Sequence, residues 1–150
     1  MLEFKQGNLL EEDAEALVNA VNCIGVMGKG IALQFKQAFP ENFQHYKKAC
    51  DAKEVQLGRM FTVSTGKLFN PKYIINFPTK RHWREKSKIE DVQTGLNVLV
   101  AEVQQLGINS IAIPALGCGN GALNWVEVKP LIESAFAELP EVKAIIFEPE

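Results

Sequence analysis

The sequence lacks the cysteine pattern that a disulfide framework or a structural zinc site requires. Its three cysteines, Cys23, Cys50 and Cys118, lie far apart, no Cys-x-x-Cys occurs, and His45 and His82 complete no metal-ligand spacing. We therefore expect no bound metal and a reducing, cytoplasmic compartment. We expect no cofactor either.

Long apolar runs and a strong overall charge are also missing. No stretch approaches the roughly 20 apolar residues of a membrane span, and the N-terminus shows no signal-peptide pattern. The 16 Lys and Arg against 18 Asp and Glu give a formal net charge of −2, which excludes a uniformly basic surface. The positive charge is local instead, because 67–88 contains seven Lys or Arg and one acid. We expect a basic face there that attracts a phosphate-bearing substrate.

The two common glycine-rich phosphate loops are absent as well. The Rossmann loop needs Gly-x-Gly-x-x-Gly, and the Walker A loop ends in Gly-Lys-Ser/Thr. Here the order is Gly25-x-x-Gly28-Lys29-Gly30, between a predicted buried strand over 16–22 and a predicted helix over 30–39. Such a turn exposes backbone N–H groups, and the helix N-terminus adds positive charge. The turn therefore predicts a phosphate site of a different kind.

A second glycine loop, 117–122, follows another predicted strand. The other predicted strands cover 2–6, 59–64, 72–77, 110–116 and 142–147. The other predicted helices cover 41–52, a long one that opens at the capping box Ser87-x-x-Glu90 and ends at Gly107, and 125–139. This alternation predicts one three-layer α/β/α domain with a mixed, largely parallel central sheet. Because ligands bind at the carboxyl edge of such sheets, the two loops together predict a diphosphate site.

Five stretches carry a family resemblance: 7–9, 19–22, 25–32, 75–80 and 113–121. In order along the whole chain, they resemble the macrodomain, the ADP-ribose-binding fold. The run Asn22–Ala32 resembles the branch that includes terminal ADP-ribose glycohydrolases and ADP-ribose-1″-phosphate phosphatases. The run Asn76-Phe-Pro-Thr-Lys-x-His-Trp-Arg84 is similar to the bacterial DNA ADP-ribosyl glycohydrolase antitoxins.

The resemblance implies a hydrolase that removes ADP-ribose from thymine bases of single-stranded DNA. It implies free ADP-ribose as product, and a cognate DNA ADP-ribosyltransferase toxin as the partner that the antitoxin opposes. Two alternatives stay open: a non-catalytic ADP-ribose-binding module, and an ADP-ribose-1″-phosphate phosphatase.

The resemblance also implies roles for individual residues. Lys80, with Asn22, would be catalytic, and Arg81, His82, Trp83 and Arg84 would bind DNA. ADP-ribose would be bound by Asn8, Leu9, Asn22, Gly28, Gly30, Ile31, Ala32, Leu33, Thr79, Gly117, Cys118, Gly119, Asn120 and Gly121. Within that set, Asn8 and Leu9 would hold the adenine end, 28–33 the diphosphate, and 117–121 the other phosphate and the distal ribose.

The chemistry of Lys80 leaves several roles open. The amine could attack the anomeric carbon or the opened sugar, activate water, or protonate the leaving base, and each basic role needs a lowered pKa. Burial and the neighbouring Arg81 would both lower it, whereas a lysine that only holds phosphate would not need this. Related enzymes that act on protein carry an acid at the place of Gly121, and this chain has none.

Two further questions concern side chains beside Lys80. His82 or Trp83 could stack on DNA bases, or Trp83 could be tucked into the core. Cys118 could form a thiol dyad with His82, although a tightly packed residue is the simpler interpretation.

The chain stops at Glu148-Pro149-Glu150, directly after its last predicted strand. Antitoxins of this type carry a further C-terminal region that meets the toxin. We therefore expect 1–150 to be a single macrodomain, the excised catalytic domain of a longer protein, and to be a monomer.

Overall fold

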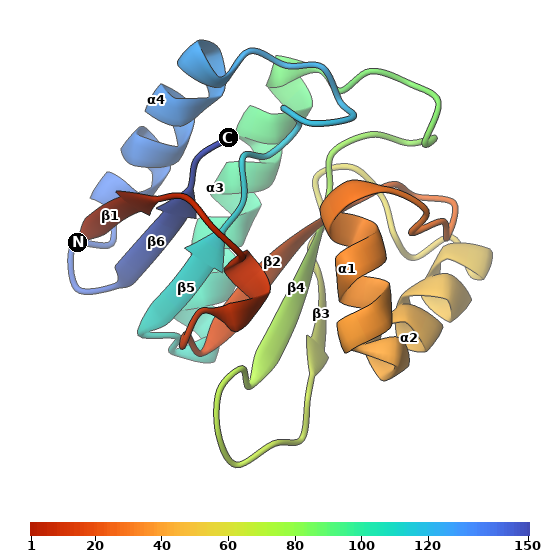
Figure 1. Cartoon of the computed structure of the whole chain (residues 1–150), viewed down its shortest axis with the longest axis horizontal. Helices are drawn as coiled ribbons and strands as arrows, with labels where there is room; N and C mark the ends of the chain where they lie inside the picture. The colour runs from red at the N-terminus through yellow and green to blue at the C-terminus, as the bar shows by residue number, and fades with distance from the viewer.

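The computed structural model describes all of residues 1–150 and contains one six-stranded sheet between two layers of helices (Figure 1). The strands, β1 to β6, are Leu2–Lys5, Ala16–Val21, Phe61–Ser64, Tyr73–Pro78, Ser110–Ile113 and Lys143–Phe147. The helices, α1 to α4, are Gly30–Ala38, Pro40–Asp51, Ile89–Leu106 and Trp125–Ala137, and a short 3-10 helix, η1, spans Leu9–Glu11. The predicted three-layer α/β/α architecture is confirmed.

The order of the strands across the sheet is β1-β6-β5-β2-β4-β3. Every neighbouring pair is parallel except β3 and β4, which are antiparallel. The sheet is therefore mixed and largely parallel, as the sequence predicts. The strands β2 and β5 are neighbours, so the two glycine loops that follow them emerge side by side at the same edge of the sheet.

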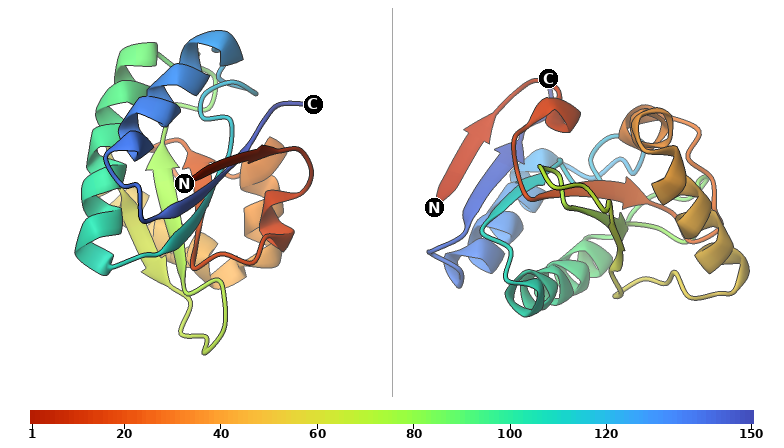
Figure 2. Two further views of the ribbon diagram at one scale, coloured as in Figure 1. Left: turned by 90° about the vertical axis from the view of Figure 1, so that its left-hand side faces the viewer. Right: turned by 90° about the horizontal axis from the view of Figure 1, so that it is seen from below.

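The helices cover both faces of the sheet, α3 and α4 on one side and α1 and α2 on the other (Figure 2). The α3–α4 side holds the largest core cluster, where Leu96, Leu99 and Phe136 pack against inward residues of the strands. Phe35 of α1 and Tyr46 of α2, both fully buried, anchor the other side. With both faces covered, the central strands are apolar almost throughout.

Helix α3 packs against β4 at a glycine. A Cβ atom built on Gly95 would lie 2.4 Å from the Cζ atom of Phe77, a separation that real contacts do not allow. Phe77 is fully buried, so its ring fills the space that a side chain at position 95 would need. The glycine in the middle of a long helix is therefore explained by packing against the ring.

One predicted helix start is wrong. Ser87 does not cap α3: the N-cap residue is Lys88, and no side chain caps that end. Ser87 is buried instead, and its backbone N–H donates to the carbonyl oxygen of Gly121 at 2.9 Å. The pattern Ser-x-x-Glu is present, but the serine is used to pack against the second glycine loop.

The other helix ends lie within two residues of the predicted ones. Gly107 ends α3 in the left-handed conformation, with φ at 65°. Asn124 caps α4, its side chain accepting a hydrogen bond from the backbone N–H of Val126. The helix η1 was not predicted, and β5 ends at Ile113 rather than at position 116. None of the helices is both long and apolar enough to span a membrane.

Candidate active site

A cavity of about 1040 Å³ opens where the carboxyl ends of β4, β2, β5 and β6 meet. Its volume lies just above the usual range of small-molecule sites, about 300–1,000 Å³. Both glycine loops line it, as the sequence predicts for neighbouring parallel strands. The residues of the predicted site that line the cavity are Asn22, Gly28, Gly30, Ile31, Ala32, Thr79, Lys80, Trp83, Arg84, Gly117, Cys118, Gly119, Asn120 and Gly121.

Five residues of the predicted site lie outside the cavity wall: Asn8, Leu9, Leu33, Arg81 and His82. Leu9 is buried in the core under α1. The Oδ1 atom of Asn8 accepts a hydrogen bond from the backbone N–H of Leu10 at 3.0 Å and so caps η1. The contact of Asn8 and Leu9 with adenine, implied by the resemblance, stays a prediction.

Asn22 organises the first glycine loop. Its Nδ2 donates to the carbonyl oxygen of Val26 at 2.8 Å, and its Oδ1 accepts from the backbone N–H of Ile24 at 3.1 Å. The buried hydroxyl of Tyr46 lies 2.8 Å from both the Oδ1 and the backbone carbonyl of Asn22, and burial raises the pKa of this tyrosine. Because Oδ1 is engaged by the protein, it has little capacity left to hold a reacting water.

The two loops approach each other across the cavity. Gly30 has a φ of +58°, and a Cβ atom built on it would lie 3.3 Å from the Nδ2 atom of Asn120 in the second loop. A glycine at this position allows both the left-handed backbone and the close approach. The ligand-facing backbone of the two loops therefore lies within reach of a single small molecule.

The second loop is packed from behind by Ser87. A Cβ atom on Gly121 would lie 2.3 Å from the Oγ atom of Ser87 and 2.4 Å from the carbonyl oxygen of Gly117. No side chain fits at position 121 without movement of this backbone. The packing in this chain therefore leaves no space at position 121 for the acidic side chain that related enzymes carry there.

Lys80 follows β4 and reaches into the cavity. Its Nζ atom donates to the carbonyl oxygen of Trp83 at 3.1 Å and to that of Asn120 at 3.4 Å, which links β4 to the second glycine loop. Burial lowers the pKa of Lys80 from its ordinary value, the Glu85 carboxylate opposes this, and the Lys29 ammonium adds to it. The lowering by burial agrees with the sequence analysis. The expected second cause is wrong, because the neighbouring charge that lowers this pKa is Lys29 and not Arg81.

Residues 81–84 form an exposed turn beside Lys80. Trp83 is 41% exposed, so it is not tucked into the core. Its ring lies 5.3 Å from the ring of His82, and the guanidinium of Arg84 lies 4.6 Å from its centroid. The Nδ1 atom of His82 accepts from the backbone N–H of Arg84. Of the two interpretations that the sequence left open, the structure favours an aromatic surface that a base can reach.

Cys118 is a packed residue rather than a nucleophile. Burial raises the pKa of its thiol to about 11, so the thiolate is scarce at neutral pH. Its Sγ atom donates to the carbonyl oxygen of Leu116 and forms no hydrogen bond with His82. No group of three or more His, Cys, Asp or Glu side chains is arranged to hold a metal ion.

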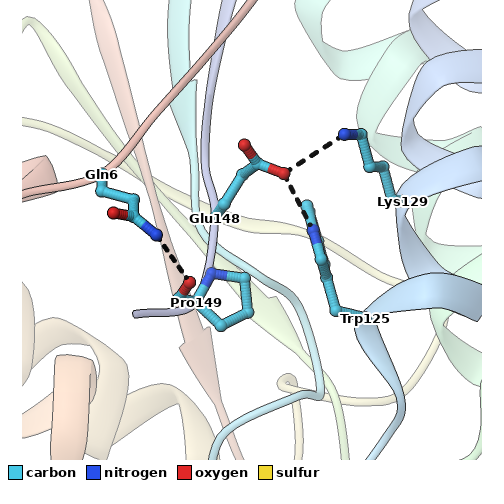
Figure 3. A network of polar contacts seen from close by, with 5 residues as sticks. All are labelled: Gln6, Trp125, Lys129, Glu148 and Pro149. Carbon is cyan, nitrogen blue, oxygen red and sulfur yellow. Dashed lines mark hydrogen bonds and ion pairs between the residues drawn. The ribbon is translucent and has the colours of Figure 1, made fainter.

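One end of the cavity is lined by residues that were not predicted from the sequence. The wall there includes Leu123, Trp125, Phe147, Glu148 and Pro149. Figure 3 shows the polar contacts that hold this region, with Glu148 accepting from Trp125 and Lys129. Phe147 and Glu148 stand at the carboxyl end of β6, so the rule that located the two glycine loops could have located them too.

The chain is similar to known proteins over its whole length. A family model described as Macro domain matches residues 18–132. The solved macrodomain of Mycobacterium tuberculosis DarG is 53% identical, with a TM-score of 0.98, over 100% of this chain and 99% of that one. The solved macrodomain of Thermus aquaticus DarG is 55% identical, with a TM-score of 0.96, over 99% of both chains.

A longer relative is the Thermus aquaticus protein named DNA ADP-ribosyl glycohydrolase. It is 55% identical over 99% of this chain and 41% of its own length. The chain thus spans about two fifths of the length of such curated relatives. The family model matches most of this chain, and the solved macrodomains match it over almost the whole of both chains, so these matches define the family. The chain belongs to the macrodomain family and, within it, to the group of the DarG macrodomains.

Proposed function

We propose that this macrodomain is a DNA ADP-ribosyl glycohydrolase, which removes ADP-ribose from thymine bases of single-stranded DNA. We propose further that it serves as the catalytic domain of an antitoxin and opposes a DNA ADP-ribosyltransferase toxin. The observation that carries the proposal is the Nζ atom of Lys80, held at the cavity wall between the turn at 81–84 and the second glycine loop, with a lowered pKa. The relatives named DNA ADP-ribosyl glycohydrolase support it.

In this proposal the diphosphate of ADP-ribose lies between the glycine loops. The start of α1, with Gly28, Gly30 and Ile31, offers backbone N–H groups and the positive end of the helix dipole. The backbone of 117–121 holds the second phosphate and the distal ribose from the other side. A related solved structure, that of Thermosipho africanus DarTG in complex with ADP-ribose, supports a ligand of this class.

The distal ribose would then lie beside Thr79 and Lys80. Hydrolysis breaks the bond between the anomeric carbon and the base nitrogen; the hydroxyl of water joins the carbon and a proton joins the base. The transition state has oxocarbenium character, as in glycoside hydrolysis. The lowered pKa of Lys80 suits either attack by its neutral amine or activation of the water.

Asn22 acts as a positioning residue in this scheme. Its side chain joins the backbone of the first loop to Tyr46, so it fixes the shape of the wall beside the ribose. Because Gly121 leaves no room for an acid, release would depend on Lys80 and on water rather than on a second carboxylate.

The DNA strand would pass over the turn at 81–84. Trp83 and Arg84 line the cavity and are both exposed, next to Lys80. An aromatic ring beside cationic side chains is the usual arrangement for single-stranded DNA, in which bases stack and phosphates pair with cations. We propose that a base next to the modified thymine stacks on the Trp83 ring.

The experiment uses an ADP-ribosylated single-stranded oligonucleotide and follows the loss of the adduct. We expect release by the wild-type protein and a loss of about 10²- to 10⁴-fold for Lys80→Ala, the usual range for a group that transfers a proton. The matched control is Lys143→Ala, at the opposite end of the sheet, which should keep full activity. Borohydride trapping of an adduct on Lys80 would identify attack on the opened sugar.

The alternatives give different results in the same set of assays. A non-catalytic reader would bind ADP-ribose in calorimetry and release none from DNA. A phosphatase would release inorganic phosphate from ADP-ribose-1″-phosphate. Equal release by the wild-type protein and Lys80→Ala would refute the role of this lysine.

A further inference from the structure

The cavity has a second polar site at the end far from Lys80. Lys80 follows β4, whereas Glu148 follows β6, and the order β6-β5-β2-β4 separates the two strands by three steps. At about 4.8 Å a step, the two ends lie roughly 14 Å apart. A nucleotide sugar that delivers its distal ribose to Lys80 and crosses the glycine loops therefore directs its base toward Glu148.

The carboxylate of Glu148 is held on one oxygen only. Its Oε2 atom accepts from the Nε1 of Trp125 at 3.1 Å and from the Nζ of Lys129 at 3.2 Å, both on α4 (Figure 3). The Oε1 atom receives no hydrogen bond from the protein. These two donors lower the pKa of Glu148, so the group is ionised at neutral pH. One oxygen is thus fixed by the protein and the other is free to accept from a ligand.

The backbone around Glu148 is fixed in advance of any ligand. The backbone N–H of Glu148 donates to the carbonyl oxygen of Lys5 at 2.9 Å. The side chain of Gln6 donates to the carbonyl oxygen of Pro149 at 3.1 Å (Figure 3). These contacts tie the end of β6 to β1, so the carboxylate is presented on a supported strand end.

The surroundings suit a flat aromatic base. Leu123, Trp125, Phe147 and Pro149 line this end of the cavity together with Glu148. The indole of Trp125 is fixed by the same hydrogen bond that fixes the carboxylate. Asn8, for which the resemblance implied the adenine contact, uses its side-chain oxygen to cap η1 and lies outside the wall.

We propose that Glu148 is a specificity-determining residue: its Oε1 accepts a hydrogen bond from the exocyclic amine of the ligand's adenine. This inference rests on the proposed function, which supplies an adenine nucleotide sugar as ligand. A hydrogen bond to a charged group accounts for about a 10- to 100-fold preference for adenine over a base that lacks the amine.

The test compares ADP-ribose with inosine diphosphate ribose, in which a carbonyl oxygen replaces the amine. Binding of each is measured by calorimetry for the wild-type protein and for Glu148→Gln. The oxygen of the glutamine can keep the bonds to Trp125 and Lys129, which turns its NH₂ group toward the base. That group repels the adenine amine and donates to the carbonyl of hypoxanthine.

We expect the wild-type protein to prefer ADP-ribose by about 10- to 100-fold, and Glu148→Gln to lose or reverse that preference. On modified DNA the variant should raise KM and leave kcat unchanged, since Lys80 is distant. The matched control, Glu150→Gln, changes an exposed carboxylate outside the cavity wall and should keep the preference.

The outcomes separate this inference from the proposed function. A Glu148→Gln variant that keeps the wild-type preference overturns the role of Glu148 and leaves the glycohydrolase proposal standing. A wild-type protein that binds neither nucleotide sugar overturns both. A lower melting temperature of the variant would not imitate the expected result, because unfolding reduces the binding of both ligands equally.

Discussion

Replacing Gly121 with alanine tests whether the second glycine loop is held in place by the packing of Ser87. The new Cβ atom would lie 2.3 Å from the Oγ of Ser87 and 2.4 Å from the carbonyl oxygen of Gly117. Ordinary van der Waals contact begins near 3.4 Å, so the loop must move by about 1 Å. Overpacking of this size typically reduces the free energy of unfolding by about 1–3 kcal/mol.

The expected result has a structural and a functional part. For a domain of this size, the lost stability corresponds to a melting temperature lower by roughly 2–12 °C. The loop also lines the cavity, and the carbonyl of Asn120 accepts from Lys80. A displacement of about 1 Å between reacting groups can reduce the rate by about 100-fold, and we expect a loss of that order.

Calorimetric melting and the oligonucleotide assay measure the two parts. Gly119→Ala is the matched control for stability, because a Cβ atom there meets nothing within 4 Å, and it should melt close to the wild-type protein. Combining Gly121→Ala with Ser87→Gly removes the close contacts with Ser87, leaves the one with the Gly117 carbonyl, and should recover part of the melting temperature. Wild-type melting and turnover in Gly121→Ala would refute the argument that this packing positions the loop.

Two further predictions concern the pH profile and the core. If the neutral amine of Lys80 acts, kcat/KM rises with pH toward the pKa of this lysine. Glu85→Gln should move this rise to lower pH, because the Glu85 carboxylate raises that pKa. Lys29→Gln should move it to higher pH, because the Lys29 ammonium lowers that pKa. Shifts in the same direction would contradict the assignment. Gly95→Ala should reduce the free energy of unfolding, measured in urea, by about 1 kcal/mol net, because the clash with Phe77 exceeds the gain in helix propensity. Unchanged stability would show that the Phe77 ring moves freely away from the new methyl group.

The location of the cavity was predictable because it follows from local patterns. Glycine-rich turns after two apolar strands are visible in the sequence, and parallel strands present their carboxyl ends at one edge. The positions of Gly30, Lys80 and Asn120 in the cavity wall agree with this. Their roles toward the ligand are still predictions, as is the division of chemistry between Lys80 and water.

Other features depended on contacts between distant segments. Ser87 has the sequence pattern of a helix cap, yet it packs against Gly121, 34 positions along, a contact that no local pattern encodes. Likewise, the charge that lowers the pKa of Lys80 comes from Lys29 in another loop and not from its neighbour in sequence. The place of Glu148 at the cavity edge was predictable, because it follows a predicted strand, but its hydrogen bonds to Trp125 and Lys129 depend on how α4 packs beside the end of β6.

The sequence by itself determined the order of strands and helices, the edge of the sheet that forms the site, and the family. Periodicity, glycines and turn residues act over a few positions, so they can be recognised without coordinates. The tertiary structure alone decided which side of Gly121 is filled, which charges surround the Lys80 amine, and which carboxylate faces the far end of the cavity. These depend on distances between segments far apart in the chain, and burial and electrostatics act through those distances.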